Sequence, residues 1–372
     1  MQISINAHLL TNDPSYRAAG IHTYIEQTLR ALPAVAPSDW QFKAYVGAQY
    51  PLELEGYQMV RSQWQTQSPI RRILWEQLVQ PFQLTGDLFH ATAFVTPLVQ
   101  RLPSVVTIYD LSFVHYPARL PRSRRLYLST MTRRSCEQAQ RVIAISQATA
   151  DDLTQLWNIP SSKIDIAVPG YDKTRFKPLS QAEQEAFRAQ KSLSERFWFF
   201  VGTLEPRKNL PMLLEAYASL QPHERLPLVI GGGKGWDYQP IFDAVKTHRL
   251  EKEVQFIGYV PTDELPIWYN CAELFIYPSV FEGFGLPVLE AMACGTPILT
   301  SDQSSLPEVA GNVGMCISPH DGHAWADALR FAFHNRAWRE EQSLAGIERA
   351  QNFSWTHTAE QTLYSYQQAL QA

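Results

Sequence analysis

Two glutamates, Glu282 and Glu290, flank the start of an expected helix in the stretch Tyr277-Pro-Ser-Val-Phe-Glu-Gly-Phe-Gly-Leu-Pro-Val-Leu-Glu290. A strand ends here, a glycine-rich turn follows, and Pro287 falls in the first turn of the helix, a position that proline favours. Carboxylates only accept hydrogen bonds, so this pair suits a diol better than a metal ion or proton transfer. Alternatively, Glu282 caps the helix and Glu290 is a solvated helical residue. The helix start also presents N–H groups that attract anions and hydroxyls, those of Phe284, Gly285 and Leu286.

Two adjacent cations, Arg207 and Lys208, follow a proline in the stretch Gly202-Thr-Leu-Glu-Pro-Arg-Lys-Asn209, between an expected strand and an expected helix. Cationic donors at the end of a strand can hold a diphosphate. Gly20 opens the first expected helix, where the missing side chain lets the backbone approach a phosphate. Taken alone, such cations more often belong to a solvated loop, and one loop glycine carries little information.

Strands and helices alternate along the whole chain. Apolar patterns predict strands over 2–7, 40–46, 87–90, 104–109, 141–145 and 164–168, and then over 196–202, 226–231, 254–258, 272–278 and 296–300. Helical spacing predicts helices over 21–32, 147–157, 210–220, 287–293 and 355–370, with Ser146 as the N-cap of the second. This alternation implies parallel βαβ units in two doubly wound domains, which bind ligands at the carboxyl ends of their strands.

The length of 372 residues fits two domains, and the turn-prone segment 169–178 is the expected linker. A composition with 45% hydrophobic and 18% charged residues excludes disordered and coiled-coil classes. No apolar run reaches the roughly 18 residues of a membrane span. Four scattered cysteines provide neither a disulfide framework nor a zinc site. We therefore expect a soluble intracellular protein.

The net charge of −4 conceals an asymmetry, because residues 1–176 carry a net charge of +4 and the remainder −8. This difference argues for two domains with different partners, and neither half is basic enough for a nucleic-acid binder. Seven arginines crowd into one segment: Arg119, Arg122, Arg124, Arg125, Arg133, Arg134 and Arg141. Their face is either simply solvated or meets an anionic acceptor or membrane surface.

The E-x7-E pattern of Glu282 and Glu290, together with the Glu-Pro-Arg-Lys-Asn stretch, resembles the retaining nucleotide-sugar glycosyltransferases of family 4. Further landmarks follow in the family's order and extend the resemblance over nearly the whole chain: Val106-Thr-Ile-Tyr-Asp110, Val142-Ile-Ala-Ile-Ser146, Val168-Pro-Gly-Tyr-Asp172 and Phe353-Ser-Trp355. The resemblance implies an α/β GT-B fold, in which two Rossmann-like doubly wound domains face each other across a cleft. Residues 1–170 would bind the acceptor, with helix 356–372 packing back on them, and residues 178–355 would bind the nucleotide-sugar donor.

The resemblance also implies roles for the donor-site residues. Glu290 would bind the ribose hydroxyls, Glu282 would contact hydroxyls of the transferred sugar, and Arg207 and Lys208 would hold the diphosphate. Backbone groups of the glycine-rich turn would contact sugar and phosphate, through Gly283, Phe284, Gly285 and Leu286. Gly20 would face the diphosphate from the other domain, and Tyr259 and Val260 would lie where the base is read.

Two departures from the family pattern concern the transferred sugar. Some relatives have a histidine where this chain has Tyr109. The polar candidates are therefore Asp110, at the end of an expected strand, and His115, which alternatively is an ordinary loop histidine. The glycine loop also lacks the Lys-Gly-Gly type of sequence found in glycogen and starch synthases, which argues against an ADP-glucose polymerase.

The resemblance implies retaining transfer of a hexosyl group from a UDP- or GDP-sugar to a glycan or lipid-linked acceptor in polysaccharide or glycoconjugate synthesis. Neither a metal nor another cofactor would be needed, because cations and the helix N-terminus would neutralise the leaving diphosphate. The alternatives are a related hydrolase, phosphorylase or epimerase of sugar nucleotides, and a sugar-binding protein without catalysis. We expect a cytoplasmic enzyme, with peripheral contact to the inner membrane face through the Arg119–Arg141 region.

Overall fold

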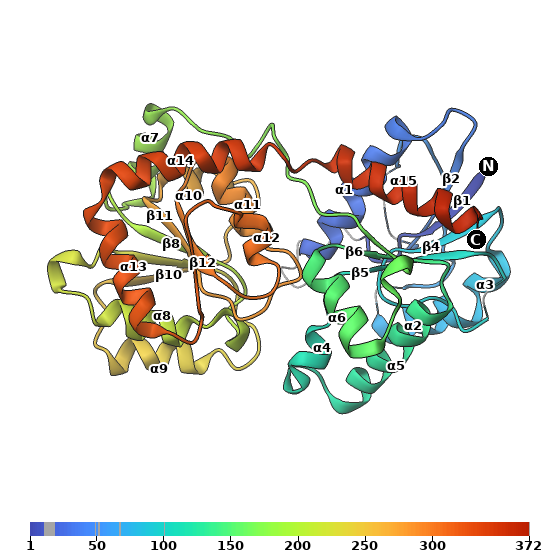
Figure 1. The fold of residues 1–372 in the computed structure, drawn as a ribbon, viewed down its shortest axis with the longest axis horizontal. Coiled ribbons are helices and arrows are strands. Elements are labelled where there is room, and N and C mark those ends of the chain that lie inside the picture. The colour runs from blue at the N-terminus through green and yellow to red at the C-terminus, as the bar shows by residue number, and fades with distance from the viewer. Residues whose placement is uncertain (11–18, 49, 51–52, 67, 100, 372) are drawn as a thin grey trace. The chain divides into compact units, whose positions relative to one another are not determined.

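The computed structural model describes residues 1–10, 19–48, 50, 53–66, 68–99 and 101–371, excepting the side chains of residues 19 and 119. It divides into two compact units (Figure 1). Unit 1 comprises Met1–Gly170 and Ser354–Ala372, and unit 2 comprises Tyr171–Phe353. Among the described residues, no helix is both long enough and apolar enough to cross a bilayer.

In its described residues, unit 1 contains a seven-stranded parallel sheet in the order β3-β2-β1-β4-β5-β6-β7. Its strands are β1 (Gln2–Asn6), β2 (Gln41–Val46), β3 (Tyr57–Arg61), β4 (Leu88–Ala91), β5 (Ser104–Ile108), β6 (Arg141–Ala144) and β7 (Ile164–Ile166). Its helices are α1 (Ala19–Val35), α2 (Pro69–Leu78), α3 (Gln80–Gln83), α4 (Ser112–His115), α5 (Arg122–Gln138), α6 (Gln147–Trp157) and α15 (Trp355–Gln371), with 3₁₀ turns η1 (Pro117–Arg119) and η2 (Ser161–Lys163).

Unit 2 has a six-stranded parallel sheet in the order β10-β9-β8-β11-β12-β13. Its strands are β8 (Trp198–Val201), β9 (Leu228–Gly231), β10 (Val254–Gly258), β11 (Leu274–Tyr277), β12 (Ile298–Ser301) and β13 (Met315–Ile317). Its helices are α7 (Gln181–Lys191), α8 (Leu210–Ala218), α9 (Gln239–Thr247), α10 (Leu265–Cys271), α11 (Leu286–Ala293), α12 (Leu306–Ala310), α13 (Gly322–His334) and α14 (Arg336–Ala350), with 3₁₀ turns η3 (Pro206–Lys208) and η4 (Pro222–Glu224).

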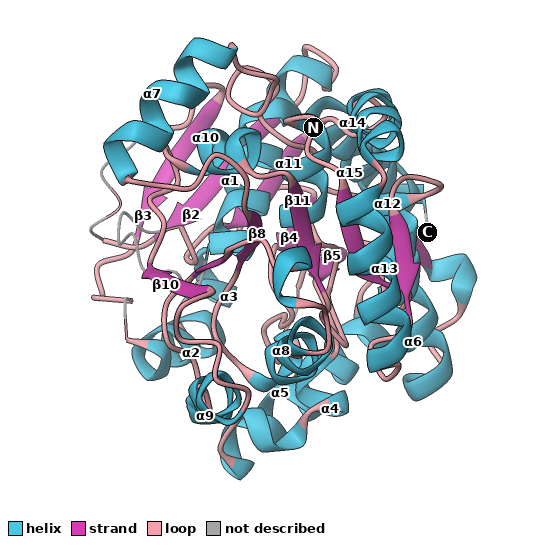
Figure 2. Ribbon diagram, turned by 90° about the vertical axis from the view of Figure 1, so that its left-hand side faces the viewer, coloured by secondary structure: helices cyan, strands magenta, loops and turns pink. Residues whose placement is uncertain are grey.

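Each sheet has helices on both faces (Figures 1 and 2), so its central strands are largely buried. Strand β8, with the sequence Trp-Phe-Phe-Val, shows this pattern, because its three aromatic side chains are fully buried. The predicted doubly wound α/β architecture is therefore confirmed in both units. In each sheet the strand order reverses once, between β1 and β4 in unit 1 and between β8 and β11 in unit 2.

The last helix of the chain, α15, packs in unit 1 against α1 and across β4 to β7. Polar bonds fix it there: the Thr358 hydroxyl donates to the Val168 carbonyl at 2.6 Å, and the Ser365 hydroxyl donates to Asp165 at 2.7 Å. Its Tyr366 hydroxyl lies 2.7 Å from Nδ1 of the buried His90. Unit 1 is therefore built from both ends of the chain.

Local sequence signals predict helix α6 well. The Ser146 hydroxyl accepts a bond from the Thr149 N–H at 3.1 Å, which confirms the predicted N-cap and the helix over 147–157. The sequence patterns miss two strands, β3 and β13. Both lie at sheet edges, where partial exposure weakens the apolar pattern, and β13 has only three residues.

Candidate functional site

The candidate site of unit 2 lies where the strand order reverses, because β8 and β11 are neighbours whose following loops diverge. Such a switch point at the carboxyl ends of strands is where doubly wound sheets bind ligands. The loop after β8 carries Glu205, Arg207 and Lys208, and the loop after β11 carries Glu282. The topology thus brings residues about 75 positions apart to one edge of the sheet.

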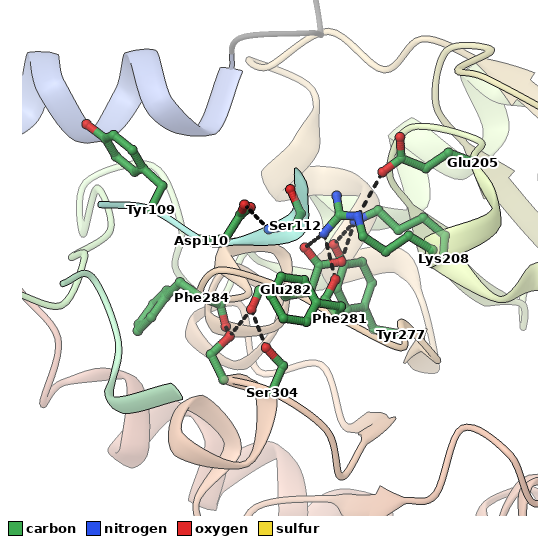
Figure 3. A network of polar contacts seen from close by, with 12 residues as sticks. Tyr109, Asp110, Ser112, Glu205, Lys208, Tyr277, Phe281, Glu282, Phe284 and Ser304 are labelled. Carbon is green, nitrogen blue, oxygen red and sulfur yellow. Dashed lines mark hydrogen bonds and ion pairs between the residues drawn. The ribbon is translucent and has the colours of Figure 1, made fainter. Parts of the chain in front are cut away.

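Glu282 joins both predicted cations in one ion-pair cluster (Figure 3). Its Oε2 accepts from Nη1 of Arg207 at 2.7 Å, and its Oε1 accepts from Nζ of Lys208 at 2.6 Å. The Nε of Arg207 also donates to Glu205 at 2.9 Å. Lys208 in turn donates to the Tyr277 hydroxyl, and its Nζ lies 4.6 Å from the centre of that ring.

The cluster is nearly closed to solvent, since Glu205, Lys208 and Glu282 are each less than one tenth exposed. Burial lowers the pKa of Lys208, against the attraction of Glu282. Burial alone would raise the pKa of Glu282, but Arg207 and Lys208 outweigh it and lower that pKa to about 2. The carboxylate thus remains ionised, and together with Glu205 it balances the charge of the two cations.

This arrangement differs from the predicted division of labour, in which Arg207 and Lys208 meet a diphosphate and Glu282 separately meets a sugar. A side-chain contact across two loops is not encoded in the spacing along the chain. A phosphate reaching this site would therefore share its cations with Glu282. Sequence reasoning also missed Glu205 and Tyr277, although Glu205 opens the Glu-Pro-Arg-Lys-Asn stretch and Tyr277 ends the predicted strand.

The N-terminus of α11 begins beside the cluster, at Leu286. Gly285 is the N-cap and has a φ of 114°, and a Cβ there would lie 2.7 Å from the Leu306 side chain. A glycine is thus required by both conformation and space. The Ser305 hydroxyl bonds to the carbonyls of Glu282 and Phe284, at 2.9 and 2.7 Å, which fixes the turn.

Gly285 has no side chain to cap α11, Pro287 has no N–H, and the Val288 N–H donates to the Gly285 carbonyl at 2.9 Å. An anion would therefore meet the N–H groups of the turn that precedes the helix. The turn therefore provides a polar backbone edge next to the charged cluster. The predicted contact groups lie in this turn or at the helix start: Gly283, Phe284, Gly285 and Leu286.

Glu290 lies within α11 and has a different partner from Glu282. The Tyr269 hydroxyl of α10 donates to its Oε2 at 3.0 Å. Burial raises the pKa of Glu290 to about 7, although this bond opposes the rise. The two glutamates are thus set apart electrostatically, one held ionised and the other near half-protonation at neutral pH. The Tyr269 contact was not predicted, because no local pattern links α10 to α11.

The two residues predicted to read the base follow β10. Tyr259 is 47% exposed and so is accessible to a ligand. Val260 is buried and packs so closely on β9 that a Cβ at Gly231 would lie 2.7 Å from its Cγ2. Their role in base recognition stays a prediction.

In unit 1, Gly20 lies at the exposed start of α1, and the preceding residues 11–18 are outside the described part. Asp110 follows β5, and its Oδ1 accepts from the Ser112 N–H at 2.8 Å (Figure 3). His115 ends α4, where its Nε2 lies 2.8 Å from Oδ2 of Asp152 on α6. This hydrogen bond raises the pKa of His115.

A cavity of about 90 Å³ lies at the switch point of unit 1. Asn6 ends β1 and Thr92 follows β4, so both line it from the carboxyl edge of the sheet. From α2, Glu76 accepts a bond from the Asn6 amide at 3.1 Å, and Arg72 lies 3.9 Å from the same carboxylate. Burial raises the pKa of Glu76. A larger cavity of about 460 Å³ in unit 2, lined by Glu273 and Pro297, lies at the amino ends of β11 and β12, the opposite edge from the cluster.

Within the described ranges, no group of three or more histidine, cysteine, aspartate or glutamate side chains could hold a metal ion. The prediction that the reaction needs no metal concerns the bound state and stays a prediction.

Comparison with known proteins places both halves of the chain. A model described as glycosyl transferases group 1 matches residues 181–352, and one described as Glycosyltransferase Family 4 matches residues 20–175. The O-antigen chain mannosyltransferase B of Escherichia coli is 32% identical over 283 residues, which cover 75% of this chain and 74% of that protein. A D-inositol 3-phosphate glycosyltransferase of Nocardia farcinica is 30% identical over 285 residues, covering 74% of this chain and 62% of the relative.

Two solved structures show the same fold. The sucrose-phosphate synthase of Thermosynechococcus elongatus superposes with a TM-score of 0.76 at 24% identity, covering 99% of this chain and 98% of that one. Anabaena HepE, in complex with UDP and glucose, superposes with a TM-score of 0.75 at 18% identity, covering 99% of each chain. With the two doubly wound sheets and the sequence relatives, these matches establish that the chain belongs to the family 4 glycosyltransferases and has the GT-B fold.

Proposed function

We propose that this chain transfers a hexosyl group from a nucleoside diphosphate sugar to a glycan or lipid-linked acceptor, with retention of anomeric configuration, during polysaccharide synthesis. The observation that carries the proposal is the buried cluster of Arg207, Lys208 and Glu282 beside the N-terminus of α11. At one switch point it joins two cations, a carboxylate that can accept bonds from sugar hydroxyls, and the N-terminal end of a helix. A diphosphate joined to a sugar matches that combination.

The transfer step follows from the chemistry of the anomeric carbon. The bond from that carbon to the β-phosphate oxygen breaks through an oxocarbenium-like transition state, and the acceptor oxygen bonds on the same face. The departing phosphate oxygen takes the proton of the acceptor hydroxyl. Arg207, Lys208 and the α11 N-terminus would stabilise the negative charge that develops on the phosphate, which is the main contribution asked of the protein.

Glu282 has two functions in this proposal. It holds Arg207 and Lys208 in place before the donor arrives, since both cations bond to it. While these cations stay beside it, the carboxylate remains ionised and can accept bonds from sugar hydroxyls as well. Glu290, on the same helix, would accept from the ribose hydroxyls in its ionised form.

The acceptor site is proposed for unit 1, where the cavity at the switch point is lined by amide, hydroxyl, carboxyl and guanidinium groups. Asn6, Thr92 and Glu76 are suited to bind sugar hydroxyls there. Asp110, at the end of the next strand, remains the proposed contact to the transferred sugar. Relatives named as O-antigen mannosyltransferases favour a mannosyl donor and a polysaccharide product, whereas the UDP complexes of HepE favour uridine.

The test is a thermal-shift panel of UDP, GDP, UDP-glucose, UDP-N-acetylglucosamine and GDP-mannose, followed by product analysis. A ligand at about a hundred times its Kd stabilises a protein by about 2.7 kcal/mol. The compounds that carry the correct base should therefore raise the melting temperature by several degrees. Incubation with that donor and candidate glycan acceptors should give a glycoside whose anomeric configuration, read by NMR, matches the donor. Free sugar formed at the same rate with and without acceptor would instead show a hydrolase. A panel with no shift would remove the proposal.

A further inference from the structure

Helix α2 exposes a row of large apolar side chains on its outer face. Ile70, Leu74 and Leu78 follow at intervals of four residues, so they line one side of the helix, and they are 71%, 44% and 61% exposed. The inner side of α2 is anchored by Trp75, which is buried against the His8 ring. The exposed side chains of Ile70, Leu74 and Leu78 therefore do not belong to the core of unit 1.

Neighbouring segments extend this row. Phe82, on α3, is 64% exposed, and the Arg101 guanidinium lies 5.1 Å from the centre of its ring. Leu98 and Val99 are also about half exposed, and the Leu98 N–H donates to Gln77 of α2 at 2.8 Å. We call this set the α2–α3 surface: Ile70, Leu74, Leu78, Phe82, Leu98 and Val99, with Arg71 and Arg101 beside them.

Exposed apolar groups concentrate in this part of the chain. Of the fourteen large apolar side chains found exposed among the described residues, eight lie between Trp64 and Leu126. An apolar patch of this kind on one face of a protein marks a site of interaction with a partner or a membrane.

The same region is strongly basic. Residues 62–141 contain ten arginines, no lysine and four acidic residues, within a chain of net charge −4. Helix α5, which supplies Arg122, Arg124 and Arg134 on its exposed positions, lies next to α2 (Figure 1), and both helices line the unit 1 cavity. A phospholipid surface offers the complementary combination, an anionic layer above an apolar one.

Two of the arginines predicted for this contact have other partners. Arg141 is half-buried and forms an ion pair with Asp165 on the adjacent strand β7. It therefore has a structural role and is not one of the arginines that we assign to the membrane contact. Arg133 bonds to Glu137 at 2.8 Å. The side chain of Arg119 lies outside the described part. The exposed apolar side chains of this region, in contrast, lie on α2, on α3 and in the loop at 98–99. The arginine pattern of the sequence did not predict them.

We infer that the α2–α3 surface docks unit 1 onto an anionic phospholipid bilayer, with the apolar row at the level of the acyl boundary and the arginines at the headgroups. The positive charge of this surface favours an anionic bilayer over a second copy of the chain. A second copy of this chain would bring the same excess of arginine to the interface, which like-charge repulsion disfavours. The inference concerns unit 1 alone and does not depend on the proposed transfer reaction.

The test is sedimentation of the full chain with vesicles of phosphatidylcholine alone and of phosphatidylcholine mixed with phosphatidylglycerol, at low and high salt. We expect binding to the mixed vesicles at low salt and little binding to phosphatidylcholine. The triple variant Ile70→Ser, Leu74→Ser, Leu78→Ser should lower the partition coefficient at least about tenfold. The double variant Arg71→Gln, Arg101→Gln should lower it about fivefold for each arginine, on the anionic vesicles only.

Matched controls lie in unit 2. Leu344 on α14 is 71% exposed, as is Ile70, and Arg336 is a highly exposed arginine on the same helix. Leu344→Ser and Arg336→Gln should bind vesicles as the unaltered chain does, and circular dichroism should show all variants folded. The inference fails if the mixed vesicles sediment no protein at low salt, or if the triple variant binds normally. It fails equally if the surface proves to be a protein contact, shown by a lipid-free dimer in analytical ultracentrifugation that the triple variant abolishes.

Discussion

The two sheets of this protein reverse strand order in the same way, yet the side chains at the two reversals are arranged differently. In unit 2, the loops after β8 and β11 bring Glu205, Arg207, Lys208 and Glu282 into a closed network of ion pairs. In unit 1, the ends of β1 and β4 border an open cavity, where Arg72 and Arg124 lie with one carboxyl group and an amide, and the nearest ion pair, Arg72 to Glu76, is 3.9 Å long. A shared topology thus fixes where a site lies, and the side chains decide what it can hold.

The pKa values of two buried glutamates express this difference. Two cations bond to Glu282 and outweigh burial, so its pKa falls to about 2. Glu76 has Arg72 only at 3.9 Å and an amide donor, and burial raises its pKa. A network held charged suits an ionic ligand such as a diphosphate, whereas the amide, hydroxyl and carboxyl groups at the unit 1 cavity suit the hydroxyls of a glycan.

The largest effect is expected from Lys208→Ala, because it removes a buried cation that would stabilise the leaving phosphate. One such donor contributes about 2.7–4 kcal/mol to the transition state, so turnover should fall about a hundredfold or more in steady-state kinetics. Lys191→Ala is the matched control, since Lys191 pairs with Glu264 at 3.0 Å on the surface of the same unit. Near-normal turnover in Lys208→Ala would separate the cluster from catalysis.

The second prediction compares the two glutamates directly by urea unfolding. Glu282→Gln should lower the free energy of unfolding by about 3–5 kcal/mol, because it leaves two buried cations short of a charged partner. Glu76→Gln should lower it by less, since Glu76 has one amide donor at 3.1 Å and its cation, Arg72, only at 3.9 Å. The Glu282 contribution is present above pH 4.5 and lost as the pH falls toward 2. Equal losses in the two variants would contradict the electrostatic difference between the units.

A third, smaller effect concerns Glu290, whose pKa is raised to about 7. If its ionised form accepts from the ribose, the Kd of the nucleotide should rise about tenfold in Glu290→Gln at pH 8. Because the pKa of Glu290 is higher in the folded state than in the unfolded state, its contribution to the free energy of unfolding falls as the pH rises from about 4.5 to 7. Glu290→Gln should therefore raise the melting temperature at pH 8 and change it little at pH 5. A Kd independent of pH and of this substitution would exclude the ribose contact.

Local patterns were sufficient to predict the doubly wound class, most of the strands and the positions of the site loops, but they missed many of the helices, among them α2 and α10. The N-cap at Ser146 and helix α6 follow from a few adjacent residues, as does the turn that requires Gly285. The loops after β8 and β11 could likewise be placed at one sheet edge from the strand pattern. These features depend on short-range geometry, which sequence spacing encodes.

Contacts between distant side chains could not be predicted in this way. Glu282 meets Arg207 across 75 positions, and Arg141 meets Asp165 only because β6 and β7 pair in one register. Helix periodicity also shows that Ile70, Leu74 and Leu78 share a face, but it does not show that this face remains uncovered. Such outcomes depend on how the elements pack.

The smallest effect is expected from His115→Gln, which removes the hydrogen-bonded pair of His115 and Asp152 in unit 1. His115 and Asp152 are about one third and one fifth exposed, so their pair resembles a surface salt bridge worth at most about 1 kcal/mol. Since the bond raises the pKa of His115, its stabilisation is present below pH 6.5 and is lost as the pH rises through the folded-state pKa. The free energy of unfolding at pH 6 should fall slightly, with turnover within about threefold of normal, whereas Asp110→Asn should reduce turnover further. A loss of turnover in His115→Gln as large as in Lys208→Ala would instead place the imidazole at the transferred sugar, and the catalytic charges would then be divided between the two units.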